Sequence, residues 1–126
     1  MSIAIRTART EADFIVARAL ADRMAQWDAA MSKAAGFTSE DVFAAYYAED
    51  ARELRATLSG PGSAMLIAYD GERPIGSVGY ARLSETACEV QKFFVLEDAR
   101  GKGAGGMLLE DLFACMATDG YARACL

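Results

Sequence analysis

Apolar and polar positions follow two different periods along the first third of this 126-residue chain. Residues 2–7 alternate with a period of two, which is typical of a half-buried strand. From residue 10 onward the apolar positions recur every three or four residues, which predicts an amphipathic helix ending at Gly36. A capping-box pattern at Thr10 and Asp13 marks its start, and its length leaves room for an internal break. The apolar stripe comprises Val16, Leu20, Met24, Trp27 and Met31.

A second helix is predicted to start at residues 38–41 and to stop at the Gly60-Pro61-Gly62 sequence. Tyr46 and Tyr47 are adjacent, so on a helix their side chains point about 100° apart. Both could pack in the core, or one could face a cleft while the other packs. The expected buried side comprises Phe43, Tyr47, Leu54 and Leu58.

Three strands are predicted next, over residues 64–69, 74–83 and 87–96. Short turn signals separate them, so we expect an antiparallel meander. Gly76 and Gly79 fall inside the middle strand and predict a bulge or a close backbone approach. A helix over residues 107–116 and a fifth strand over residues 121–126 complete the order β-α-α-β-β-β-α-β.

The composition of the chain indicates a single domain and argues against nucleic-acid and membrane partners. The chain is 53% hydrophobic and 25% charged, so residues 1–126 can form a single domain with its own core. The net charge of −5, without a basic cluster, argues against nucleic acid as a partner. No apolar run reaches the roughly 18 residues of a membrane span, and no export signal begins the chain, so we expect no membrane partner.

The cysteines and the lack of histidine limit the possible chemistry. Without histidine, the chain cannot form a His-based catalytic triad or a zinc-hydrolase site. Cys88, Cys115 and Cys125 are odd in number and scattered, so we expect small buried side chains in a reducing compartment, the cytoplasm. Their spacing does not suggest a metal site.

A glycine-rich turn joins the fourth strand to the last helix and is the best candidate for a binding site. Its glycines allow a close backbone approach, and the first N–H groups of the following helix can bind a phosphate. Gly101, Gly103 and Gly106 fit G-x-G-x-x-G, but that fingerprint needs a βαβ unit and an acidic residue about 20 positions further on. Neither fits here, and no triphosphate-binding G-x-x-x-x-G-K-[ST] sequence occurs.

Arg100, Gly103 and Gly105 instead fit the sequence R-x-x-G-x-G. Together with the strand over residues 88–96 that precedes it, this turn resembles the acyl-coenzyme-A motif of the GCN5-related N-acetyltransferase (GNAT) superfamily. The resemblance is specific from about residue 64 to residue 126. It implies an α/β (α+β) fold with a central mixed, mostly antiparallel sheet, and we expect the chain to lack the last helix and strands of a complete member.

The resemblance also implies an activity. We expect an N-acetyltransferase in which a primary amine of a small molecule or peptide directly attacks acetyl-coenzyme A, without a metal. The alternative is a catalytically weak or inactive acyl-coenzyme-A-binding or regulatory module. The resembled family commonly uses a Tyr of its last helix as the acid, and Tyr121 does not occupy that position.

The family's cofactor contacts map onto the end of the fourth strand and onto the turn. The pantetheine arm is expected along Phe94 and Val95, with an N–H near Val95 stabilising the oxyanion. The backbone N–H groups of the turn would bind the pyrophosphate. The expected cofactor-binding residues of the turn are Arg100, Gly101, Lys102, Gly103, Ala104, Gly105 and Gly106.

Glu89 occupies the position of the family's general base, six residues before Val95. Strand alternation predicts that Glu89, Gln91, Phe93 and Val95 share one face, with Lys92 as a solvated charge on the other. The alternative for Glu89 is a solvated strand carboxylate.

The last strand is expected to expose an edge, with Tyr121, Ala124 and Leu126 as its apolar flank. Exposed edges pair, are covered or aggregate, so we expect a homodimer formed through this end of the sheet.

Overall fold

The computed structural model describes residues 2–33, 35–36, 38 and 49–125. Its strands form one sheet in the order β1-β2-β3-β4-β5. The first four strands pair antiparallel, whereas β5 joins β4 in parallel, so the expected mixed, mostly antiparallel sheet is confirmed. The strands are β1 (Ile3–Thr7), β2 (Ala64–Asp70), β3 (Arg73–Arg82), β4 (Ala87–Val95) and β5 (Arg123–Cys125).

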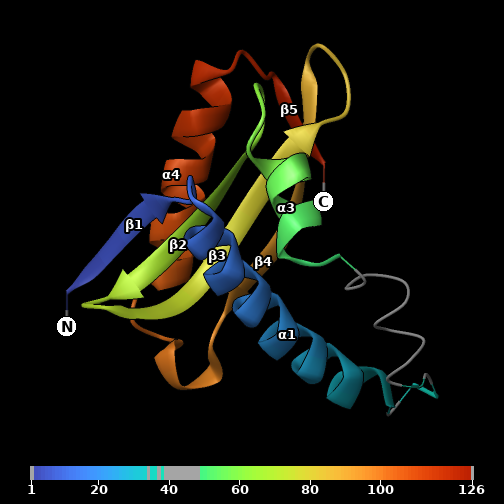
Figure 1. Cartoon of the computed structure of the whole chain (residues 1–126), viewed down its shortest axis with the longest axis vertical. Coiled ribbons are helices and arrows are strands. Elements are labelled where there is room, and N and C mark those ends of the chain that lie inside the picture. The colour runs from blue at the N-terminus through green and yellow to red at the C-terminus, as the bar shows by residue number, and fades with distance from the viewer. Residues whose placement is uncertain (1, 34, 37, 39–48, 126) are drawn as a thin grey trace.

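Helices cover both faces of the sheet (Figure 1). Helices α1 (Glu11–Lys33) and α3 (Ala51–Leu58) lie on one face, and α4 (Ala104–Thr118) lies on the other. Two glycines of β3 show which helix packs closely on each face. A Cβ on Gly79 would lie 3.2 Å from Leu58 Cδ1 of α3, and a Cβ on Gly76 would lie 3.3 Å from Leu108 Cδ1 of α4.

Helix α1 begins at the predicted capping box. The Asp13 N–H donates to Thr10 Oγ1 at 3.2 Å, and the Thr10 N–H donates to Asp13 Oδ2 at 3.0 Å. The helix continues to Lys33 without the internal break that its length allowed. Phe14 and Ala17 are fully buried, whereas Met31 is exposed, so the N-terminal half of α1 makes the core contacts.

The predicted second helix is confirmed only in its last part. In the described residues it is α3, which Asp50 caps: the Glu53 N–H donates to Asp50 Oδ1 at 2.9 Å. Leu54 and Leu58 are buried as predicted. The predicted start over residues 39–41, together with Phe43, Tyr46 and Tyr47, lies outside the described residues.

A bulge in β4 decides which side chains face which helix. Ser77 pairs with Phe94, but Gly79 pairs with Gln91, so β4 has one residue more than β3 in this interval. Lys92 lies there with a φ of 57°, in the left-handed region. The extra residue reverses the alternation, because a strand has a side-chain period of two.

The prediction that Glu89, Gln91, Phe93 and Val95 share a face is therefore wrong. Gln91 pairs with Gly79, where an added Cβ would point toward Leu58 of α3. Glu89 lies two residues before Gln91 and therefore on the same face. Val95 pairs with Gly76 on the α4 face, where a Cβ on Gly105 would contact both Phe93 and Val95.

The C-terminal segment differs from the prediction in detail. Strand β5 spans only Arg123–Cys125, and all three residues are exposed. Tyr121 is buried and its hydroxyl donates to the Gly62 carbonyl at 2.5 Å, so it is not part of an exposed flank. Cys88 is buried as expected, but Cys115 is half-buried and Cys125 is exposed. In the described ranges, no helix is long and apolar enough to cross a membrane.

Candidate functional site

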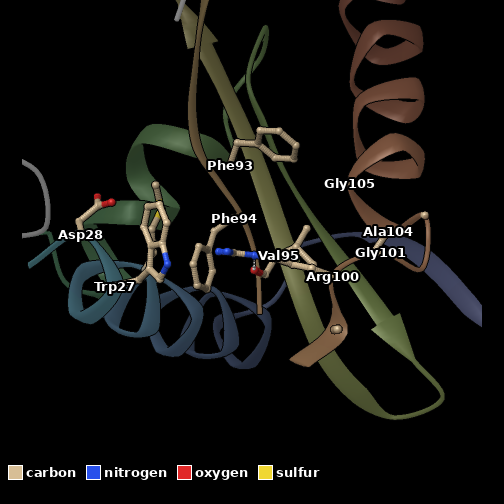
Figure 2. Close-up of a pocket in the computed structure, with 12 residues that line it drawn as sticks. Trp27, Asp28, Phe93, Phe94, Val95, Arg100, Gly101, Ala104 and Gly105 are labelled. Carbon is tan, nitrogen blue, oxygen red and sulfur yellow. Dashed lines mark hydrogen bonds between the residues drawn. The ribbon is translucent and has the colours of Figure 1, made fainter. Parts of the chain in front are cut away.

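A cavity of about 380 Å³ lies where the end of β4, the glycine turn and α1 meet (Figure 2). Strand β4 and the turn form one wall, and the C-terminal half of α1 forms the other. The lining residues are Met24, Trp27, Asp28, Phe93, Phe94, Val95, Ala99, Arg100, Gly101, Gly103, Ala104 and Gly105. Most of the lining surface is apolar, which suits the body of a small-molecule ligand.

The glycine turn is built around two left-handed residues. Gly101 has a φ of 82° and Gly103 a φ of 90°, conformations that a residue with a Cβ rarely adopts. Gly103 is the N-cap of α4, which begins at Ala104, three residues earlier than predicted. The first N–H groups of α4 therefore lie beside the cavity, where they can bind an anion.

Arg100 ties the turn to the end of β4. Its Nε donates to the Val95 carbonyl at 2.9 Å. Its guanidinium lies 5.1 Å from the centroid of the Trp27 ring and 5.5 Å from that of Phe94, within cation–π range of both. The side chain thus provides a positive charge in a cavity that is otherwise largely apolar.

The short 3₁₀ helix η1 (Glu97–Ala99) connects β4 to the turn and is anchored to β3. Arg73 Nη2 donates to both carboxylate oxygens of Asp98, at 2.8 and 3.0 Å. The hydrogen bond from Arg73 lowers the pKa of Asp98 below its ordinary value. The pair is exposed, so it fixes the course of the turn more than it stabilises the fold.

Most of the predicted cofactor residues come together. Phe94, Val95 and five residues of the turn line the cavity, whereas Lys102 and Gly106 do not. The sequence analysis missed five lining residues: Met24, Trp27, Asp28, Phe93 and Ala99. For Trp27 the available signal was its place on the apolar stripe of α1, which predicts packing but does not distinguish a core contact from a cavity wall.

Glu89 is exposed near the start of β4, where it pairs with Ala81 on one side and with Cys125 on the other. It does not line the cavity. Lys92 differs from the prediction of a solvated charge: its side chain is only 10% exposed, and its Nζ lies 3.6 Å from Glu49 Oε1.

No group of three or more Cys, Asp or Glu side chains suited to a metal ion occurs in the part of the chain that the structure describes.

Comparison with known proteins identifies a family. A family model described as "Acetyltransferase (GNAT) family" matches residues 16–125. By sequence, no curated protein matches the chain.

Several solved structures have a similar fold. A GCN5-related N-acetyltransferase from Ralstonia eutropha is 18% identical with a TM-score of 0.70, over 99% of this chain and 82% of that one. The PaiA N-acetyltransferase from Thermoplasma acidophilum, in complex with coenzyme A, is 18% identical with a TM-score of 0.69, over 95% and 75%. An aminoglycoside acetyltransferase from an uncultured soil metagenomic sample is 15% identical with a TM-score of 0.68, over 98% and 78%. At these identities, the likeness shows the fold alone.

Proposed function

Because this chain belongs to the acetyltransferase (GNAT) family, we propose that it transfers an acetyl group from acetyl-coenzyme A to a primary amine. Family membership supports acyl transfer in general. One observation carries the finer proposal: a single cavity runs from the C-terminal end of β4 to the glycine turn at the N-terminus of α4. A solved structure of this fold contains coenzyme A, which supports acetyl-coenzyme A as the donor.

In this proposal the turn binds the pyrophosphate. The backbone N–H groups from Gly101 to Gly106 and the guanidinium of Arg100 provide the donors and the positive charge. The pantetheine arm lies along Phe94 and Val95, and its thioester lies near the bulge. The apolar lining excludes water around the thioester, which strengthens the hydrogen bond from an N–H near Val95 to the developing oxyanion.

The chemical step is a direct attack. The lone pair of the neutral amine forms a C–N bond with the thioester carbonyl carbon, and the C–S bond breaks as coenzyme A leaves as the thiolate. The proton lost by the amine goes to Glu89, through a bridging water because Glu89 does not line the cavity. The acceptor is a small-molecule or peptide amine. An aminoglycoside acetyltransferase of the same fold gives one precedent for a small-molecule acceptor.

A second candidate function is an acyl-coenzyme-A-binding module with weak or no turnover. The position of Glu89 outside the cavity lining favours it, because a general base must reach the amine directly or through water.

Release of the coenzyme A thiol, measured with acetyl-coenzyme A and a panel of amines, distinguishes the two functions. We expect amine-dependent turnover, and we expect Glu89→Gln to lower it by roughly 10²-fold with little change in coenzyme A affinity. Glu85→Gln, a change of the same kind at an exposed turn residue, serves as the control. Coenzyme A binding without turnover would favour the module, and equal rates for Glu89→Gln and wild type would remove Glu89 from the mechanism.

A further inference from the structure

Lys92 has a backbone conformation that needs an explanation. In the described part of the chain it is the one residue other than glycine with a positive φ, 57°. A long side chain in the left-handed region is disfavoured, because its Cβ crowds the backbone. Such residues persist where the surrounding structure holds them, and they gather at functional sites.

Both the carbonyl and the ammonium group of Lys92 have partners. Its carbonyl accepts a hydrogen bond of 2.9 Å from the Ser77 hydroxyl, and Ser77 is only 2% exposed. Its ammonium pairs with the Glu49 carboxylate at 3.6 Å, with the lysine side chain 10% exposed and that of Glu49 33% exposed. The pair is therefore screened by solvent much less than a surface ion pair.

The ion pair links β4 to α1 indirectly, through Glu49. Glu49 lies directly before the cap of α3, and its carbonyl accepts a hydrogen bond from the guanidinium of Arg18 on α1. Arg18 also pairs with Asp22, one turn further along the same helix, at 2.8 Å. Helix α1 supplies Trp27 and Asp28 to one wall of the cavity, and residues 93–95, which directly follow Lys92, line the other wall.

The bulge decides how β4 meets the cavity. It places Phe93 and Val95 toward α4, and it places Phe94 on the opposite face, beside Trp27 and Arg100 (Figure 2). All three residues line the cavity and directly follow Lys92. A small shift of the bulge would therefore move the strand along which the thioester is proposed to lie.

We propose that Lys92 is a positioning residue, whose ion pair with Glu49 holds the β4 bulge and thereby sets the reacting end of the cofactor against α1. The kinetic part of this inference rests on the proposed acetyltransferase function. The geometric part does not, because it concerns only how residues 93–95 are held. The two parts need separate measurements.

The kinetic test uses Lys92→Met, which keeps the side-chain length and removes the charge. We expect kcat to fall by about 10- to 100-fold, because small misplacements of reacting groups are costly, while the KM for acetyl-coenzyme A changes by less than about threefold. Glu49→Gln should act alike, and the double variant should be no worse than either single one. Lys92→Arg should restore much of the rate, and Lys33→Met, at an exposed end of α1, serves as the control.

The second test needs no activity. Amide NMR of the folded variants should show shifted signals for residues 93–95 in both Lys92→Met and Glu49→Gln, and unshifted signals there in Lys33→Met. Unchanged signals at residues 93–95 in both folded variants would overturn the inference, whatever the kinetics. If wild type turns over no amine, the proposed function fails and the NMR result alone decides the inference. A fall in kcat/KM that comes entirely from a higher KM would also overturn it.

Discussion

At the scale of single residues, Gly105 is where the proposed cofactor site is most sensitive. A Cβ there would lie 3.6 Å from Phe93 Cζ and 3.8 Å from Val95 Cγ2, which are ordinary contact distances. A larger side chain would extend toward Phe93 and Val95, in the wall of the cavity that β4 and the turn form. Gly103 is less informative, because its φ of 90° means that substitution would also strain the cap of α4.

We predict that Gly105→Val lowers coenzyme A affinity by at least about tenfold while the protein remains folded. The physical reason is loss of the close backbone approach that a bound pyrophosphate requires. Isothermal titration calorimetry with coenzyme A measures the affinity, and circular dichroism verifies the fold. Ala117→Val, at an exposed position of the same helix, is the matched control. Unchanged affinity in folded Gly105→Val would show that the pyrophosphate does not bind at this turn.

At the scale of elements, the capping box of α1 matters because α1 forms a whole wall of the cavity. Asp13 accepts hydrogen bonds from the Thr10 N–H and also from the Arg9 N–H, the latter at 2.8 Å. These backbone donors, Arg9 first, lower the pKa of the Asp13 carboxyl. A carboxyl with a lowered pKa in the folded state stabilises the fold above its unfolded-state pKa, and this contribution is lost as the pH falls.

We predict that Thr10→Ala lowers the free energy of unfolding by about 1 kcal/mol, the usual cost of losing an N-cap. Asp13→Asn should also destabilise the protein at neutral pH. The gap between Asp13→Asn and wild type should narrow from about pH 4 downward, as the carboxyl becomes protonated in wild type. Urea unfolding at several pH values measures both effects. A gap that stays constant down to pH 2 would show that the Asp13 charge does not contribute.

At the scale of the whole molecule, the outer edge of β5 is the surface through which we expect copies of the chain to associate. Strand β5 pairs with β4 on one side, and its outer side has no ladder partner among the described residues. All three of its residues are exposed, so their backbone groups can pair with another strand. Tyr121 is buried in the core and adds nothing to this edge.

We propose that two copies of the chain associate through β5, as a symmetric dimer. Ala124→Lys would place a charge on this short edge, and we expect it to shift the protein toward the monomer. Light scattering at several concentrations measures the association, with Ala117→Lys on α4 as the control. A monodisperse wild-type monomer at high micromolar concentration would refute the dimer.

The sequence by itself determined most of the elements and the glycine turn. Hydrophobic periods, capping pairs and turn glycines act over a few residues, so they can be read locally. Thr10 and Asp13 marked the start of α1, and Gly101 and Gly103 marked a turn that only residues without a Cβ adopt readily. The resemblance at Arg100, Gly103 and Gly105 then predicted a family that the match over residues 16–125 confirms.

The tertiary structure alone decided how these elements form a cavity. The irregularity predicted at the β3 glycines is confirmed by the register shift beside Gly76, but the extra residue at Lys92 lies in β4 and depends on how β4 pairs with β3. It reversed the faces of Phe93 and Val95 relative to Glu89, which simple alternation could not predict. The contacts of Trp27 with Arg100 and of Glu49 with Lys92 join residues more than 40 positions apart. Such contacts leave no periodic signal, because they depend on how whole helices pack on the sheet.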